Sequence, residues 1–256
     1  MSESPEAPHA ATLVAENDRL AALFAEADPS VSVPTCPGWD LSQLLKHVGR
    51  GHRWAAQMVA SGATDVLNPR DVVGGRPPDG GREVAAEWLR DSVTELLDAV
   101  ASVGVDAPVW TFAGPKPSAW WVRRRLHEAT VHRGDAVLAL GRRFDIAPDV
   151  AADGLSEWLD LLTARRAGDE PPLGPGATLH LHATDESLGA AGEWLIRSDA
   201  GRVVWEHGHG KGDAAVRGGA ADLLLGALRR IPADSDRLEV LGDKGTWTTW
   251  LDRTGF

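Results

Sequence analysis

The amino-acid sequence predicts an all-α four-helix bundle followed by a small α+β domain. Up to about residue 140, apolar side chains recur at helical spacing in four long stretches that are separated by loops. After residue 176, short stretches of alternating apolar and polar residues are segregated from the helical stretches near the C-terminus. We therefore expect a helical domain over residues 8–145 and an α+β domain over residues 146–256.

The composition is that of an ordinary globular protein, with 43% hydrophobic and 25% charged residues in 256 positions. The formal net charge of −11 argues against a nucleic-acid partner, because phosphate binding needs a basic surface. No apolar run approaches the roughly 18 residues of a membrane span, and the N-terminus lacks the basic and then apolar pattern of a secretion signal. We expect a cytoplasmic protein without a membrane partner; the sequence does not specify its oligomeric state.

The first two helices are predicted from local signals. Residues 8–27 carry apolar side chains at helical spacing and end at an Asp-Pro pair. Two prolines hold the segment 31–39 out of helix. A second helix then begins at Asp40, and Gln43 three residues later completes the pattern of a capping box.

The next two helices follow a long loop. Residues 62–82 are rich in Gly, Pro, Asp and Arg, which is typical of a lid, a binding segment or a mobile loop. A third helix is expected from about residue 82 to 103. A fourth helix, opened by Ser118 and stopped at Gly141, carries the candidate site.

The C-terminal part is predicted to be of the α+β class. One helix is expected at 149–166 and a Gly/Pro-rich linker at 168–176. The expected strands and helices beyond the linker are strands at 178–183, 193–197, 203–206 and 214–217, a helix at 220–230, a strand at 238–241 and a final Trp-rich helix.

The fourth helix brings together a carboxylate and an imidazole. Glu128 and His132 are four residues apart, so they project from one side of the helix and can share a divalent ion. The same spacing also fits a plain surface contact. Trp121, Arg125 and Asp135 extend this stripe, which is either a solvated face or, as the tryptophan suggests, the wall of a pocket. A zinc site needs further ligands, and the single cysteine, Cys36, excludes a thiolate-rich site and an internal disulfide.

The third ligand is expected to be another histidine. His47 of the second helix is a candidate, although it also fits a half-buried, hydrogen-bonded core residue, and His52, closer to the apolar stripe, is the rival candidate. His180 and His182 alternate along a strand and are expected on a solvated face. His207 and His209 lie in a glycine-rich turn, where such a pair can pick up metal adventitiously, but flexible loops make poor catalytic sites. His127 starts an apparent zincin motif that fails, since its second histidine is replaced by valine.

Several segments resemble one family. The segment 33–50 (VPTCPGWDLSQLLKHVGR) is similar to the N-terminal signature of the mycothiol-dependent maleylpyruvate isomerase family, which belongs to the DinB-like (YfiT-like) metalloprotein superfamily. The segment 124–133 (RRLHEATVHR) resembles its second signature, and 221–230 (ADLLLGALRR) with 238–243 (LEVLGD) resembles its C-terminal domain. The likeness spans nearly the whole chain.

The resemblance implies a DinB-like bundle with a metal held by two histidines and one glutamate, which fall on His47, Glu128 and His132. It thereby favours His47 over His52. Zinc is the usual metal, and a site with N and O ligands also suits nickel, iron or manganese. Three protein ligands leave one position open, as in a catalytic zinc site.

The resemblance also implies the chemistry. The metal would lower the pKa of mycothiol, a low-molecular-weight thiol, and the thiolate would attack a small electrophile. An isomerase would release the thiol after rotation about the former cis double bond, whereas an S-transferase would leave it attached. A hydrolase that uses activated water and a non-catalytic metal-binding protein or sensor are the alternatives.

Arginines are the expected partners of a dicarboxylate substrate, because the planar guanidinium matches a carboxylate. Arg50 and Arg125 lie near the ligands in sequence, and Arg229 or Arg230 are candidates from the second domain; an exposed surface charge is the alternative for each. Cys36 is interpreted as a small packed residue, since the thiol comes with the cosubstrate.

Overall fold

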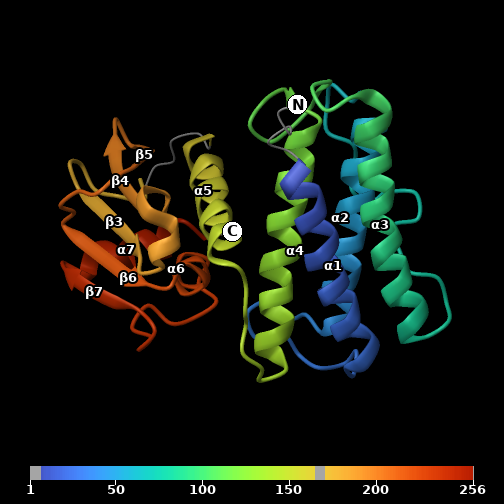
Figure 1. Cartoon of the computed structure of the whole chain (residues 1–256), viewed down its shortest axis with the longest axis horizontal. Helices are drawn as coiled ribbons and strands as arrows, with labels where there is room; N and C mark the ends of the chain where they lie inside the picture. The colour runs from blue at the N-terminus through green and yellow to red at the C-terminus, as the bar shows by residue number, and fades with distance from the viewer. Residues whose placement is uncertain (1–6, 165–170, 256) are drawn as a thin grey trace. The chain divides into compact units, whose positions relative to one another are not determined.

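The computed structural model describes residues 7–164 and 171–255, and the chain divides into two compact units, one up to Phe144 and one from Asp145 onward (Figure 1). Parts of the predicted helix 149–166 and of the predicted linker 168–176 lie outside the described residues. None of the helices in the described ranges is long and apolar enough to cross a membrane.

The first unit is helical, as predicted. The helix α2 packs against α3, α1 packs against both α3 and α4, and α2 also contacts α4. A two-stranded antiparallel ribbon, β1 with β2, precedes α4. The elements of this unit are α1 (Ala7–Glu26), α2 (Leu41–Ala60), α3 (Arg82–Val103), β1 (Pro108–Val109), β2 (Lys116–Pro117) and α4 (Ala119–Ala139).

The start of α2 has the predicted capping box. The Asp40 side chain accepts a hydrogen bond from the Gln43 backbone N–H at 2.8 Å, and the Gln43 side chain accepts one from the Asp40 N–H at 2.9 Å. The predicted cap of α4 is wrong in its chemistry. Ser118 occupies the N-cap position, but its backbone is helical and its hydroxyl donates to the carbonyls of Gly104 and Val105, so it ties down the preceding loop.

The core of the first unit is built from apolar side chains at helical spacing on all four helices. Trp88 of α3 lies against Gly49 of α2, where only a glycine leaves room for the indole ring. The loop before α3 is fastened to the same core, because the indole N–H groups of Trp54 and Trp88 donate to the carbonyls of Leu67 and Gly74. The largest fully buried side chains here are Trp121, Leu13, Leu20, Leu41, Leu44, Met58, Leu89, Leu96 and Leu126.

The second unit is a five-stranded mixed sheet with helices. Its strand order is β5-β4-β3-β6-β7, and every pair is antiparallel except β3 with β6. The helices α6 and α7 both contact β3 and β6, and α5 contacts α6 and β5. The elements are α5 (Pro148–Ala164), β3 (Thr178–Ala183), η1 (Glu186–Gly192), β4 (Glu193–Asp199), β5 (Arg202–His207), β6 (Ala214–Gly218), α6 (Ala220–Ala227), β7 (Glu239–Gly242) and α7 (Lys244–Arg253).

The two faces of this sheet differ. Leu179 and Leu181 of β3 are fully buried on one face, and Trp194 of β4 lies on that face and donates to the hydroxyl of Ser156 in α5. The opposite face carries His180 and His182. The prediction of a solvated face is wrong for His180, which is only 4% exposed.

Candidate functional site

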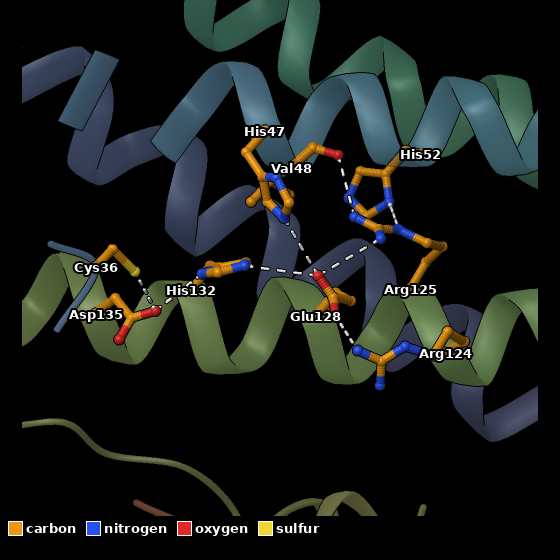
Figure 2. Close-up of polar contacts among 9 residues, drawn as sticks. All are labelled: Cys36, His47, Val48, His52, Arg124, Arg125, Glu128, His132 and Asp135. Atoms are coloured by element: carbon orange, nitrogen blue, oxygen red, sulfur yellow. Dashed lines mark hydrogen bonds and ion pairs between the residues drawn. The ribbon is translucent and has the colours of Figure 1, made fainter. Parts of the chain in front are cut away.

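Three polar side chains of the first unit converge between α2 and α4 (Figure 2). Glu128 Oε2 lies 3.5 Å from His47 Nε2 and 3.5 Å from His132 Nε2. The two imidazole rings meet edge to face, with centroids 4.9 Å apart. These are the three residues that the family resemblance singles out, and they form a group whose potential metal-ligand atoms lie within 4.8 Å of one another.

The helix α4 explains how two of these groups meet. Its positions 128 and 132 are one turn apart and face α2, where His47 lies on the facing turn. The predicted stripe around them is buried: Trp121 and Asp135 are fully buried, and Arg125 is 5% exposed. The solvated-face alternative is therefore excluded.

The orientation of His132 is set by Asp135. The Nδ1 atom of His132 lies 2.8 Å from Asp135 Oδ2, and the same oxygen accepts from the Cys36 thiol at 3.4 Å. Burial lowers the pKa of His132. The hydrogen bonds with Asp135 and Cys36 raise it by a larger amount, so the pKa of His132 lies above its ordinary value. With Nδ1 engaged, Nε2 is the ring nitrogen that faces Glu128.

The environment of His47 keeps its ring neutral. Burial, followed by the positive charges of His132, Arg125, Arg50 and Arg124, lowers the pKa of His47 to about 3. Neutral imidazole is the form that binds metals. Trp39 lies beside the ring, with a centroid distance of 4.9 Å.

Two arginines hold the carboxylate of Glu128. Arg124 donates to Oε1, and Arg125 Nη1 lies 3.6 Å from Oε2. Arg125 also donates to His52 Nδ1 at 3.1 Å and to the Val48 carbonyl at 3.2 Å, so it joins α4 to α2 (Figure 2).

The rival candidate His52 lies apart from the three converging groups. It is fully buried, its Nδ1 accepts from Arg125, and burial followed by the charge of Arg125 lowers its pKa well below the ordinary value. Within the described part of the chain, its second nitrogen has no hydrogen-bond partner. The geometry thus makes His52 a buried core residue rather than a ligand, and brings His47 to Glu128 and His132.

The other predicted arginines lie in different settings. Arg50 is exposed on α2, close enough for its charge to lower the pKa of His47, and its stem lies against Gly75 of the long loop. Arg230 belongs to the second unit, where it donates to the Leu228 carbonyl at 2.8 Å. Its catalytic role stays a prediction.

Sequence reasoning missed three contributors to this site. The helical pattern puts Asp135 on the stripe but gives it no role, and it does not assign Trp39 to the site. Cys36 is not merely a packed residue, because its thiol contacts Asp135. The only available signal was an Asp three residues after His132, the spacing of a local hydrogen bond on a helix.

The fold and these contacts define a class of protein, one with a helical N-terminal domain that carries a His/Glu cluster and a C-terminal domain built on a mixed sheet. Family models match both parts: the mycothiol maleylpyruvate isomerase N-terminal domain matches residues 10–137, and the MDMPI C-terminal domain matches residues 149–249. The chain belongs to the mycothiol maleylpyruvate isomerase family.

Solved structures share this fold. Crystal structures of the mycothiol-dependent maleylpyruvate isomerase and of a histidine-to-alanine mutant of it each match with a TM-score of 0.63 at 16% sequence identity. Each match covers 94% of this chain and 95% of the other. No curated protein matches the chain in sequence.

Proposed function

We propose that this chain is a metal-dependent isomerase that uses mycothiol to convert a maleylpyruvate-type cis substrate into its trans isomer. Family membership supports a thiol-dependent isomerase. The observation that carries the metal part is the convergence of His47, Glu128 and His132 from two helices. Zinc is the proposed metal, with nickel, iron or manganese as other divalent ions that suit this donor set.

The distances fit one ion. Metal–ligand bonds of about 2.0–2.2 Å place two ligands of a tetrahedral ion about 3.3–3.6 Å apart. Glu128 Oε2 lies 3.5 Å from each of the two imidazole nitrogens. The three donors leave one position for an exogenous group, which is typical of catalytic rather than structural sites.

The surrounding residues would prepare the three donors. His47 is neutral at pH 7, since its pKa is about 3. Asp135 fixes the ring of His132 through Nδ1, and we assign Arg125 a positioning role toward Glu128. Partners of this kind orient ligands and raise their basicity.

The reaction would proceed through the thiol of the cosubstrate. A divalent metal, when bound, lowers the pKa of a thiol so that the thiolate exists at neutral pH. The thiolate sulfur would form a bond to one carbon of the activated cis double bond, whose π-electron pair moves onto the activating carbonyl as an enolate, leaving a single bond that can rotate. Breaking the same C–S bond after rotation restores the double bond in the trans form and returns the thiol unchanged.

Arginines would bind the carboxylates of the substrate. Arg50 is the first candidate, because it is exposed and its charge reaches His47. Arg230 is proposed as a further contributor from the second domain.

We also propose that the four helices form a DinB-like four-helix bundle, and the pairwise packing of α1 to α4 supports this. Residues 8–145 and 146–256 are proposed as the two functional domains.

The test combines metal analysis with turnover. Purified chain is analysed for bound metal and assayed with mycothiol and maleylpyruvate, beside the variants His47→Ala and Lys46→Ala. Lys46 is the exposed neighbour on α2 and serves as the matched control. We expect His47→Ala to lose the bound metal. Its turnover rate should fall by more than about hundredfold, since a metal stabilises the transition state by several kcal/mol.

The same preparation separates the alternatives. After cobalt substitution, mycothiol should produce a thiolate-to-metal absorption band, which activated-water chemistry would not give. Stoichiometric consumption of the thiol would identify an S-transferase, whereas an isomerase regenerates it. A chain that binds metal but turns over no electrophile would be a metal-binding or sensor protein, and the isomerase proposal would be abandoned.

A further inference from the structure

A second cluster of histidines lies in the C-terminal unit, on the face of the sheet away from the buried Leu179 and Leu181. His180 and His182 are two residues apart on β3, so their side chains share that face. Glu193 of β4 is the direct cross-strand partner of His182. His209 joins them from the segment between β5 and β6.

All three imidazoles point at a single oxygen. Glu193 Oε2 lies 3.0 Å from His180 Nε2, 2.7 Å from His209 Nδ1 and 3.7 Å from His182 Nδ1. The potential ligand atoms of the four residues lie within 4.8 Å of one another. Ring centroids of the histidine pairs are 5.3–6.2 Å apart, and every pair is edge to face.

The glycine-rich segment 208–212 brings His209 to the sheet. A Cβ on Gly212 would lie 2.9 Å from the His180 backbone nitrogen, and one on Gly210 would lie 2.9 Å from Leu195 of β4. Only residues without side chains permit this close approach. The segment therefore covers His180, and His209 is held over the cluster rather than on a free loop.

Hydrogen bonds of Glu193 account for the positions of His180 and His209 but not for that of His182. His182 Nδ1 at 3.7 Å lies beyond hydrogen-bonding distance, and Glu193 already has contacts with two other rings. A divalent ion accounts for the arrangement, because it draws three nitrogens and one oxygen toward a common centre.

We propose that His180, His182, Glu193 and His209 form a second divalent metal site of the structural zinc type. Four protein ligands complete a tetrahedral shell, so this site stabilises the fold and leaves no position for a substrate. The ion would join β3 and β4 to the glycine-rich segment 208–212. The proposal is independent of the function assigned to the helical unit.

The test measures zinc binding to the full chain with the helical cluster disabled. The background variant His47→Ala/His132→Ala is freed of metal and titrated with zinc, and we expect it to bind one ion per chain. Adding His209→Ala should weaken zinc binding by at least about tenfold. Removing a residue that only hydrogen-bonds to a metal ligand already costs about this much affinity, so removing a ligand should cost no less. His209 is 77% exposed at its side chain, so its replacement leaves the core intact.

The control is His207→Ala in the same background, since His207 lies two residues away and outside the cluster. It should bind zinc as the background does. Cobalt should give a tetrahedral d–d spectrum that the further change His182→Ala abolishes, and zinc should raise the melting temperature only in chains with the intact cluster. A folded background variant that binds no zinc, or zinc binding that His209→Ala leaves unchanged, would overturn the proposal.

Discussion

The Nδ1 atom of His132 lies 2.8 Å from Oδ2 of Asp135, a carboxylate that is fully buried. This contact determines which nitrogen of His132 is directed at Glu128 and fixes the plane of the ring. A histidine that binds a metal commonly shares its other nitrogen with a carboxylate in this way. The relation leads to a prediction about metal affinity.

Asp135→Asn should weaken metal binding by about 10–100-fold, because the ring loses the anionic partner that raises its basicity. The measurement is competition with a chromophoric chelator. Asp98→Asn on the exposed face of α3 removes the same charge elsewhere and should leave the affinity unchanged. Equal affinities in the two variants would show that Asp135 has no part in orienting a ligand.

Arg125 is predicted to support Glu128 and the packing of α2 on α4. Replacing it with methionine keeps most of the stem but removes the hydrogen bonds to His52 and Val48. We expect a loss of about 1.5–3 kcal/mol in the free energy of unfolding, together with weaker metal binding. Urea unfolding measures the first. A variant of unchanged stability and raised KM would instead identify Arg125 as a substrate-binding residue.

Gly51 makes room for that guanidinium. A Cβ at this position would lie 2.5 Å from Arg125 Nη2, which must then shift away from the Val48 carbonyl. Gly51→Ala should destabilise the fold by about 1–2 kcal/mol, since overpacking outweighs the gain in helix propensity. Thermal unfolding beside Gly174→Ala, where a Cβ meets nothing within 4 Å, is the measurement. Equal stability would mean that the arginine adapts freely.

Most of the fold could be predicted from local sequence signals, because a helix start such as Asp40 with Gln43 depends only on residues that are neighbours in the chain. The functional site was harder to predict from the sequence. The spacing of Glu128 and His132 fits equally a surface pair, and only the resemblance directed attention to His47. Cys36 and Asp135 are 99 residues apart, so no periodicity joins them. Alternation placed His180 and His182 on one face correctly, but it could not show that the segment 208–212 covers His180.

The capping box of α2 should make stability depend on pH. Asp40 accepts hydrogen bonds from the hydroxyl of Ser42 and from the backbone of Gln43, and the first of these is the largest influence that lowers its pKa below the ordinary 3.8. A depressed carboxyl pKa stabilises the folded state above the unfolded value, and this contribution is lost as the pH falls below about 3.8 through the folded pKa.

Asp40→Ala should therefore lower the free energy of unfolding by about 1 kcal/mol at pH 7, and the deficit should shrink as the pH falls below about 3.8. Asp40→Asn keeps the cap acceptor but not the charge, so it should cost less at pH 7 and also flatten the acid dependence. Chemical unfolding of the three chains from pH 2 to 7 measures both effects. A deficit for Asp40→Ala that is constant over this range would contradict the ionised cap.

The contact of Gly49 with Trp88 links stability to the loop beside the site. A Cβ at position 49 would lie 2.3 Å from the indole ring, which is buried and stacked under Arg53. The ring is rigid, so Gly49→Ala should displace it, cost about 1–3 kcal/mol of stability and weaken the indole hydrogen bond to the Gly74 carbonyl. Hydrogen exchange of residues 71–76 should then quicken relative to the Gly174→Ala chain.

Because Gly75 supports the stem of Arg50, KM for the substrate should rise in the Gly49→Ala chain while metal affinity stays constant. An unchanged KM in a chain whose loop exchanges faster would place Arg50 outside the substrate site.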